Sequence, residues 1–137
     1  GDLGYLDATV VGRGAYHQSI NALAYTATAT AIDEGGPWHL ELIQYLRGNR
    51  DLIRDWLSHH DQVTWKNSEA TYLAWLDFSQ LGWDNVQAHL IKNGLALSAG
   101  NQFGNEYSQF GRLNFGVPKA TLIEALKRIE TAINSSN

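Results

Sequence analysis

The chain has 137 residues, enough for one ordinary domain, and its 44% hydrophobic and 18% charged content excludes a disordered chain. Its formal net charge of -4 is spread along the sequence, which excludes the basic surface that nucleic acid or an anionic membrane binds. Cysteine is absent, no apolar run approaches the roughly 20 residues of a membrane span, and the start lacks a signal-peptide pattern, so we expect a cytoplasmic protein.

The first part of the chain predicts two helices after an irregular lead-in over residues 1–15. Between residues 16 and 32 small apolar residues recur at three- and four-residue steps, which predicts a closely packed, well-covered helix. The sequence Gly35-Gly36-Pro37 ends that helix and begins a second one, which runs to about His59. The predicted apolar face of the second helix comprises Trp38, Leu42, Tyr45, Leu46, Asn49, Leu52, Ile53, Trp56 and Leu57.

The middle of the chain predicts two strands and a helix. A short strand is expected near residues 63–65, and residues 71–78 (TYLAWLDF) predict a central strand because they are rich in β-branched and aromatic residues. Asp84 and Gln87 have the spacing of a capping box, so we expect a helix that begins there and ends at Gly94. Its expected apolar face comprises Val86, Leu90 and Ile91.

The last part predicts a short strand at residues 95–97 and a polar, Gly-rich loop at residues 98–109, of the kind that carries function on a rigid scaffold. Residues 111–115 predict another strand. Pro118 opens a helix to about Ile133, with Thr121 and Glu124 as a capping box and an apolar face of Leu122, Ala125, Leu126, Ile129 and Ile133. Together these elements predict a small sheet covered by helices, an α/β fold of the α+β sandwich type.

Few residues have the spacing of a catalytic or metal site. The adjacent His59 and His60 lack the spacing of a metal pair on a helix, which favours a solvated helix end over a zinc site. The glycines at residues 12–14 and 100–104 match no phosphate-binding fingerprint and favour simple turns. The spacing of three tryptophans favours core packing over a ligand cage: Trp38, Trp56 and Trp75.

Arg112 is the one residue whose position suggests a binding role. It lies in the apolar strand GRLNFG directly after the Gly-rich loop, where a permanently charged guanidinium is costly unless an anion meets its donors. Two interpretations stay open from the residues alone. One is an internal salt bridge or an edge-strand arginine, and the other is a bidentate site for a substrate carboxylate.

Several blocks of the sequence, in this order, resemble one enzyme family. They are ATAIDEGGPWHLELIQYLRGNRDLI (residues 29–53), ATYLAWLD (70–77), SAGNQFG (98–104) and RLNFGVPKATLIEALKRI (112–129). They are similar to the carboxy-terminal segment of fold-type I pyridoxal-phosphate (PLP) enzymes, in the branch of MalY and PatB type cystathionine β-lyases and their aminotransferase relatives. The similarity extends over nearly the whole chain from about Gln18 onward.

The resemblance implies the small C-terminal domain of such an enzyme, with a small, mostly antiparallel sheet covered by helices and preceded by a long linking helical region. Residues 1–36 are then a lead-in and a helix from the end of the large domain, and residues 37–137 are the small domain. Arg112 corresponds to the arginine that binds the α-carboxylate of an amino-acid substrate. Asn114 is expected to hold a turn, and Ser19 to lie near the cofactor of the neighbouring subunit.

The chain also departs from the family pattern. Ala99 stands where proline is common before Gly100, and residues 104–108 lack a second glycine, which changes the expected shape of the loop. The PLP-anchoring lysine of the family lies upstream of every matched block, and none of the lysines of this chain has its setting: Lys66, Lys92, Lys119 and Lys127. The resemblance therefore implies PLP in the full-length enzyme and no cofactor bound to this segment alone.

The function implied by the resemblance is that of a PLP-dependent homodimer that acts on amino acids. We favour a carbon–sulfur β-lyase over an aminotransferase. The chain contains no methionine, so we expect residues to precede Gly1 and the chain to be a C-terminal fragment that is inactive alone. Its expected partners are its own large domain and a second subunit. The alternative is a stand-alone, noncatalytic binding or interaction module with the same fold.

Overall fold

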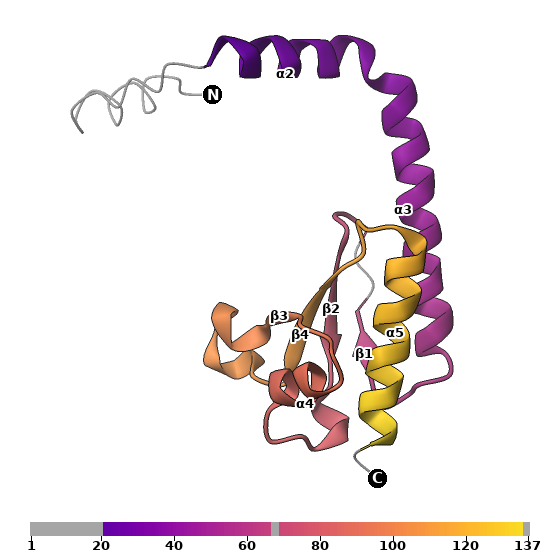
Figure 1. Ribbon diagram of the computed structural model, residues 1–137, viewed down its shortest axis with the longest axis vertical. Coiled ribbons are helices and arrows are strands. Elements are labelled where there is room, and N and C mark those ends of the chain that lie inside the picture. The colour runs from indigo at the N-terminus through magenta and orange to yellow at the C-terminus, as the bar shows by residue number, and fades with distance from the viewer. Residues whose placement is uncertain (1–20, 67–68, 136–137) are drawn as a thin grey trace, which may run out of the picture. The chain divides into compact units, whose positions relative to one another are not determined.

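The computed structural model describes residues 21–66 and 69–135. The chain divides into two compact units, Gly1–Leu40 and Glu41–Asn137. The predicted order of helices and strands is confirmed (Figure 1). The elements are α2 (Ala22–Glu34), α3 (Gly36–Leu57), β1 (Thr64–Trp65), β2 (Leu73–Asp77), α4 (Val86–Lys92), β3 (Ser98–Ala99), β4 (Phe110–Asn114) and α5 (Lys119–Asn134), with short 3-10 helices η1 (Ser79–Leu81), η2 (Gly100–Phe103) and η3 (Asn105–Tyr107).

Helix α2 of the first unit ends at a glycine, as predicted, and it begins at an asparagine cap that the sequence did not predict. The side chain of Asn21 accepts a hydrogen bond from the backbone N–H of Leu23 at 2.9 Å. The backbone N–H of Gly35 donates to the carbonyl of Ala31 at 3.1 Å, and a Cβ at Gly35 would lie 2.3 Å from that carbonyl oxygen. The predicted part of this helix before residue 21 lies outside the described residues.

The expectation that the first helix is well covered is wrong for this chain, because no residue of α2 is buried. Trp38 was expected to pack in a core, and its side chain is instead 67% exposed. Helical periodicity identifies which side chains share a face, but it does not say whether anything lies against that face. Both expectations concern faces that no other described residue of this chain covers.

The sheet of the second unit has the strand order β1-β2-β4-β3, and all its pairs are antiparallel. β2 and β4 are therefore the interior strands, which confirms that residues 71–78 contain a central strand. The short strand predicted at residues 95–97 is wrong, since β3 is formed by Ser98 and Ala99. The preceding residues close α4 instead: the N–H of Leu95 donates to the carbonyl of Leu90 at 3.0 Å.

One face of the sheet is covered by helices. Figure 1 shows the second half of α3 and helix α5 side by side along this face. Ala74 and Leu76 of β2 are 0% exposed and meet Ile53 of α3 and Leu122 of α5 in one core. Fully burying a leucine or isoleucine side chain contributes about 1.5 to 3 kcal/mol, so this face holds much of the folding energy. Of the apolar face predicted for α5, all members except Ala125 are buried.

Two predicted helix caps are wrong. Asn85, rather than Asp84, caps α4, and its side chain accepts from the N–H of Ala88 at 2.9 Å. The predicted box would have used the N–H of Gln87, so the observed cap lies one residue later and satisfies the N–H of Ala88 instead. Pro118 occupies the cap position of α5, so Thr121 lies inside the helix. Ile91, expected on the apolar face of α4, is 56% exposed. No helix of the described residues is long and apolar enough to cross a bilayer.

Candidate functional site

Arg112 lies on the face of the sheet opposite the helical core. In the register of the sheet it pairs with Trp75 of β2 on one side and with Ser98 of β3 on the other. Directly paired residues of antiparallel strands point to the same face, so these three side chains are neighbours. The next residue of β4, Leu113, is buried in the core, as the alternation of strand side chains requires. The site is therefore built on two interior strands.

The guanidinium of Arg112 has two contacts within the described residues. Its Nη2 donates a hydrogen bond to Oγ of Ser98 at 3.2 Å, and its central carbon lies 4.9 Å from the ring centroid of Phe103. Because β4 lies between β2 and β3, the edge-strand interpretation is wrong. Among the described residues no carboxylate lies within 4.0 Å of Arg112, so an internal salt bridge does not account for it either.

An aromatic cluster adjoins Arg112. The ring of Trp75 meets the edges or faces of Phe103 at 5.2 Å, Tyr107 at 5.7 Å and Phe110 at 5.6 Å between centroids. The expectation that Trp75 packs in the core is wrong, because its side chain lies on the open face and stays partly exposed. Trp56, by contrast, packs against the core as expected, and its ring stacks on His60 at 4.1 Å.

The Gly-rich segment at residues 98–109 is more ordered than a simple loop, since it contains β3 and the 3-10 helices η2 and η3. Gly100 is buried at the start of η2, and a Cβ there would lie 2.0 Å from the carbonyl oxygen of Tyr107 and 2.8 Å from that of Phe110. Only glycine permits so close a backbone approach. This approach folds the segment back on itself and places Phe103 beside Arg112.

Two asparagines hold the chain where it leaves β4. Oδ1 of Asn114 accepts from the N–H of Gly116 at 2.8 Å, which confirms the predicted turn-holding role. The second, Asn49 of α3, is 2% exposed and its Nδ2 donates to the carbonyls of Phe115 at 2.8 Å and Val117 at 2.9 Å. The helical spacing predicts Asn49 on the apolar face of α3 and does not indicate a role for it. A polar residue within an apolar stripe was the signal available.

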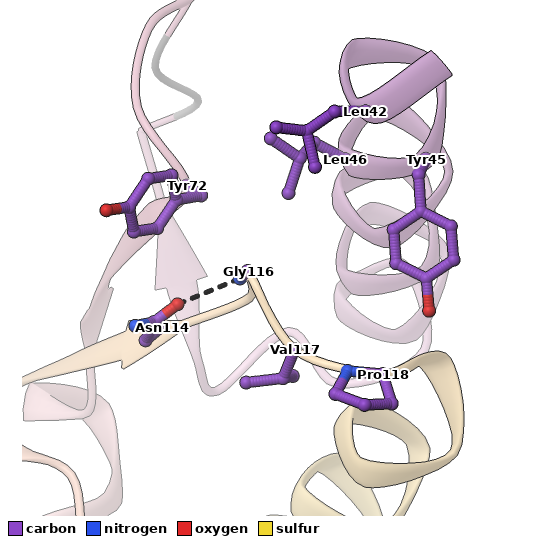
Figure 2. Close-up of a pocket in the computed structure, with 8 residues that line it drawn as sticks. All are labelled: Leu42, Tyr45, Leu46, Tyr72, Asn114, Gly116, Val117 and Pro118. Atoms are coloured by element: carbon purple, nitrogen blue, oxygen red, sulfur yellow. Dashed lines mark hydrogen bonds between the residues drawn. The ribbon is translucent and has the colours of Figure 1, made fainter. Parts of the chain in front are cut away.

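A separate cavity of about 550 Å³ lies where the turn after β4 faces α3, and Figure 2 shows its lining. Tyr72 and Asn114 line one side, and Leu42, Tyr45 and Leu46 of α3 line the other. The hydroxyl of Tyr45 accepts from the N–H of Lys119 at 2.6 Å. Arg112 does not line this cavity, and no charged side chain does. The lining of the cavity is mainly apolar, and apart from the two tyrosine hydroxyls it offers no acid, base or nucleophile.

The remaining candidates of the sequence do not form a site in the described residues. His59 and His60 end α3, and the part of the chain that the structure describes has no group of three or more side chains placed to hold a metal ion. Ser19 lies outside the described residues. All four lysines are exposed, and none belongs to the strands or 3-10 helices around Arg112: Lys66, Lys92, Lys119 and Lys127.

Comparison with known proteins gives consistent matches over nearly the whole chain. Residues 8–129 match the family described as aminotransferase class I and II. Cystathionine beta-lyase PatB from Bacillus subtilis (strain 168) is 38% identical over 119 residues, which cover 84% of this chain and 31% of PatB.

Two solved structures have the same fold. The crystal structure of OvoB matches with a TM-score of 0.89 and 34% identity, covering 98% of this chain and 35% of OvoB. A PLP-bound putative aminotransferase from Clostridium difficile 630 matches with a TM-score of 0.83 and 31% identity, covering 97% of this chain and 35% of that protein. The chain thus spans about a third of the length of the relatives it matches.

Proposed function

Because this chain belongs to the aminotransferase class I and II family, we propose that the complete protein is a PLP-dependent enzyme that acts on amino acids. We propose that it is a carbon–sulfur β-lyase and that this segment supplies its carboxylate-binding residue, Arg112. The observation that carries the proposal is a guanidinium without a carboxylate partner among the described residues, on the open face of the sheet.

The chemistry of Arg112 fits an α-carboxylate. A guanidinium presents a planar fork of N–H groups that can donate two parallel hydrogen bonds to the two oxygens of one carboxylate. Only one hydrogen bond of this guanidinium is made within the described residues, the one to Ser98. The partial burial of Arg112 beside aromatic rings strengthens its attraction for an anion, because charges there are less screened than in water.

Holding the carboxylate orients the substrate. A carboxylate held at two oxygens cannot rotate freely, so the amine and the β-carbon of the amino acid are presented in a fixed direction. This is a contribution of position rather than of acid–base chemistry.

The residues of this chain do not provide an anchor for PLP beside Arg112, since every lysine is exposed and lies outside the surrounding elements. When bound, PLP supplies the electron sink that makes bond cleavage next to the amine possible. The matched aminotransferase from Clostridium difficile is PLP-bound. We therefore propose that residues of the complete protein outside this chain hold the cofactor.

The lyase proposal is supported by the sequence similarity to PatB, which is a cystathionine beta-lyase. Transamination is the second candidate, supported by the similarity to the putative aminotransferase. We also propose that residues 1–36 belong to the end of a large domain and that residues 37–137 form the small domain. The proposed partners of this segment are an amino-acid substrate, the protein's own large domain and a second subunit. Ser19 is proposed to lie near the cofactor of that second subunit.

Arg112→Lys in the complete enzyme tests the site. We expect kcat/KM for L-cystathionine to fall by about 10- to 100-fold, because an ammonium cannot reproduce the two parallel hydrogen bonds. Steady-state kinetics with pyruvate release as the readout measures this. A matched control is Arg128→Lys, which changes an exposed arginine of α5 and should leave kcat/KM unchanged. Unchanged kinetics in Arg112→Lys would remove Arg112 from the site.

The alternative of a stand-alone module is tested with the protein expressed from its own gene. Its intact mass is compared with the 15.2 kDa of this chain, and its absorbance spectrum is examined for bound PLP. A several-fold larger mass with bound PLP supports the enzyme proposal. A mass near that of this chain, without PLP or release of pyruvate from L-cystathionine, contradicts it. Conversion of a 2-oxo acid without pyruvate release from L-cystathionine assigns transamination instead.

A further inference from the structure

We propose that Ser98 and Phe103 are positioning residues, which fix the guanidinium of Arg112 so that its remaining donors face the substrate carboxylate. This inference rests on the proposed function of Arg112. It adds two residues from the Gly-rich segment, one held by sheet pairing and one held by ring contacts. Neither contacts the reacting atoms in this proposal, and both act through Arg112.

Ser98 holds one end of the guanidinium. Its Oγ accepts from Nη2 of Arg112 at 3.2 Å, and its own backbone is paired with Arg112 in the sheet. The backbone of Ser98 is therefore held by the same ladder that holds the backbone of Arg112. A flexible arginine side chain loses considerable rotamer entropy on binding, and holding it in place beforehand reduces that cost. The side chain of Ser98 is only partly exposed, which keeps water from replacing it freely.

Phe103 contacts the guanidinium through its aromatic ring. The distance of 4.9 Å between the guanidinium carbon and the ring centroid is within the range of a cation–π contact. The ring is itself held by Trp75, whose plane meets it at 88° with 5.2 Å between centroids. Because Trp75 also pairs with Arg112 in the sheet register, both contacts belong to one rigid unit.

The backbone around Phe103 is fixed by a close approach that depends on Gly100. A Cβ at Gly100 would lie 2.0 Å from the carbonyl oxygen of Tyr107, so η2 and η3 pack closer than any other residue allows. Phe103 ends η2 and thus has a defined position relative to β4. The rings of Tyr107 and Phe110 also contact Trp75, and so help to hold the ring that contacts Phe103.

The experiment on Ser98 uses the complete, PLP-loaded enzyme and L-alanine, an amino acid that has a carboxylate but no leaving group on its β-carbon. Its binding is followed by the change in cofactor absorbance. We expect Ser98→Ala to weaken the affinity for L-alanine about fivefold. Ser98→Thr, which keeps the hydroxyl, should retain most of the wild-type affinity. Equal affinity in wild type and Ser98→Ala overturns the role of Ser98.

A double variant separates positioning from a general structural role. If Ser98 acts through the guanidinium, Ser98→Ala changes nothing further once Arg112→Ala is present. A loss of equal size in both backgrounds shows that Ser98 acts independently of Arg112 and overturns the inference. Ethylamine, which has the amine but no carboxylate, provides a second readout. Its affinity should be the same in wild type and Ser98→Ala, and an equal loss for both ligands overturns the inference.

Phe103 is tested in the same titration. Phe103→Leu removes the aromatic face but keeps an apolar side chain, and should weaken the affinity for L-alanine about threefold. Phe103→Tyr keeps the face and should restore the affinity. Equal losses in both variants contradict the cation–π role. If Arg112→Ala itself binds L-alanine as tightly as wild type, the proposed function fails. If Arg112→Ala loses affinity and neither positioning variant does, only this inference fails.

Discussion

The two faces of the sheet come from the same strands and are used differently. On the covered face, Ala74 and Leu76 of β2 are completely buried beneath α3 and α5. On the open face, Trp75 lies between them in sequence and remains partly exposed beside Arg112. Because strand side chains alternate, each interior strand carries the core on one side and the candidate site on the other. The core therefore fixes the spacing of the site.

The comparison shows what each face contributes. The covered face is apolar, and its burial stabilises the fold. The open face holds the guanidinium of Arg112. This charged group does not stabilise the fold through burial of apolar surface, and it has no carboxylate partner among the described residues. We therefore expect substitutions on the covered face to change stability, and substitutions on the open face to change binding with little loss of stability.

The largest effect on stability is expected from Leu76→Ala. Truncating a leucine that is 0% exposed should lower the free energy of unfolding by about 3 kcal/mol, because it removes buried surface and leaves a cavity. Urea denaturation followed by tryptophan fluorescence measures this. The matched control is Leu73→Ala on the open face of the same strand, which should cost less than half as much. If both variants lose the same free energy of unfolding, the two faces contribute equally to stability and the comparison is wrong.

The second-largest effect on stability is expected from Asn49, which connects α3 to the turn after β4. Asn49→Ala removes both hydrogen bonds from Nδ2 and leaves the carbonyls of Phe115 and Val117 without that donor. We expect a loss of about 2 kcal/mol in the free energy of unfolding, measured by urea denaturation. Gln44→Ala, at an exposed position of the same helix, should be nearly neutral. A neutral Asn49→Ala would show that water replaces the lost donor.

Arg112→Ala tests the open face directly. We expect the free energy of unfolding to change by no more than about 0.5 kcal/mol, since the arginine has one hydrogen bond and one ring contact within the described residues. The thermal midpoint and the urea midpoint are the measurements. A loss above about 2 kcal/mol would assign Arg112 to the architecture of the sheet and weaken the case for a binding role.

The smallest effect is expected at the surface of α5. Nε of Arg128 lies 2.9 Å from a carboxylate oxygen of Glu124, and both side chains are about half exposed. Glu124→Gln should lower the free energy of unfolding by less than about 0.5 kcal/mol, and by less still at high salt. A salt-independent loss of 1 kcal/mol or more would show that this exposed pair is not screened as expected.

Much of the fold could be predicted because its signals are local. Helical periodicity and the break at Gly35 depend on nearby residues, and both were predicted correctly. The cap of α4 was displaced by one residue, because Asp84 and Asn85 are both good caps and the path of the preceding chain selects between them. The strand at residues 95–97 was wrong because Ser98 and Ala99, not the leucines, reach the edge of β4.

The candidate site could be predicted only in part. Arg112 stood out because a charged residue in an apolar strand is unusual, and this signal lies in the sequence itself. Ser98 and Phe103 were not identified, since nothing in a polar, Gly-rich segment tells which of its side chains contacts a residue of another strand. Trp75 was assigned to the core for the same reason, because its spacing is equally compatible with either face of a sheet.

The sequence by itself determined the order of helices and strands, the glycine that separates the first two helices, and the arginine on which the site depends. These follow from local conformational preferences and from the cost of placing a charge among apolar residues. Tertiary structure decided which face of the sheet the helices cover, and so placed Trp75 with Arg112 instead of in the core. It also brought Ser98 to Arg112, because strand register depends on pairing between distant segments.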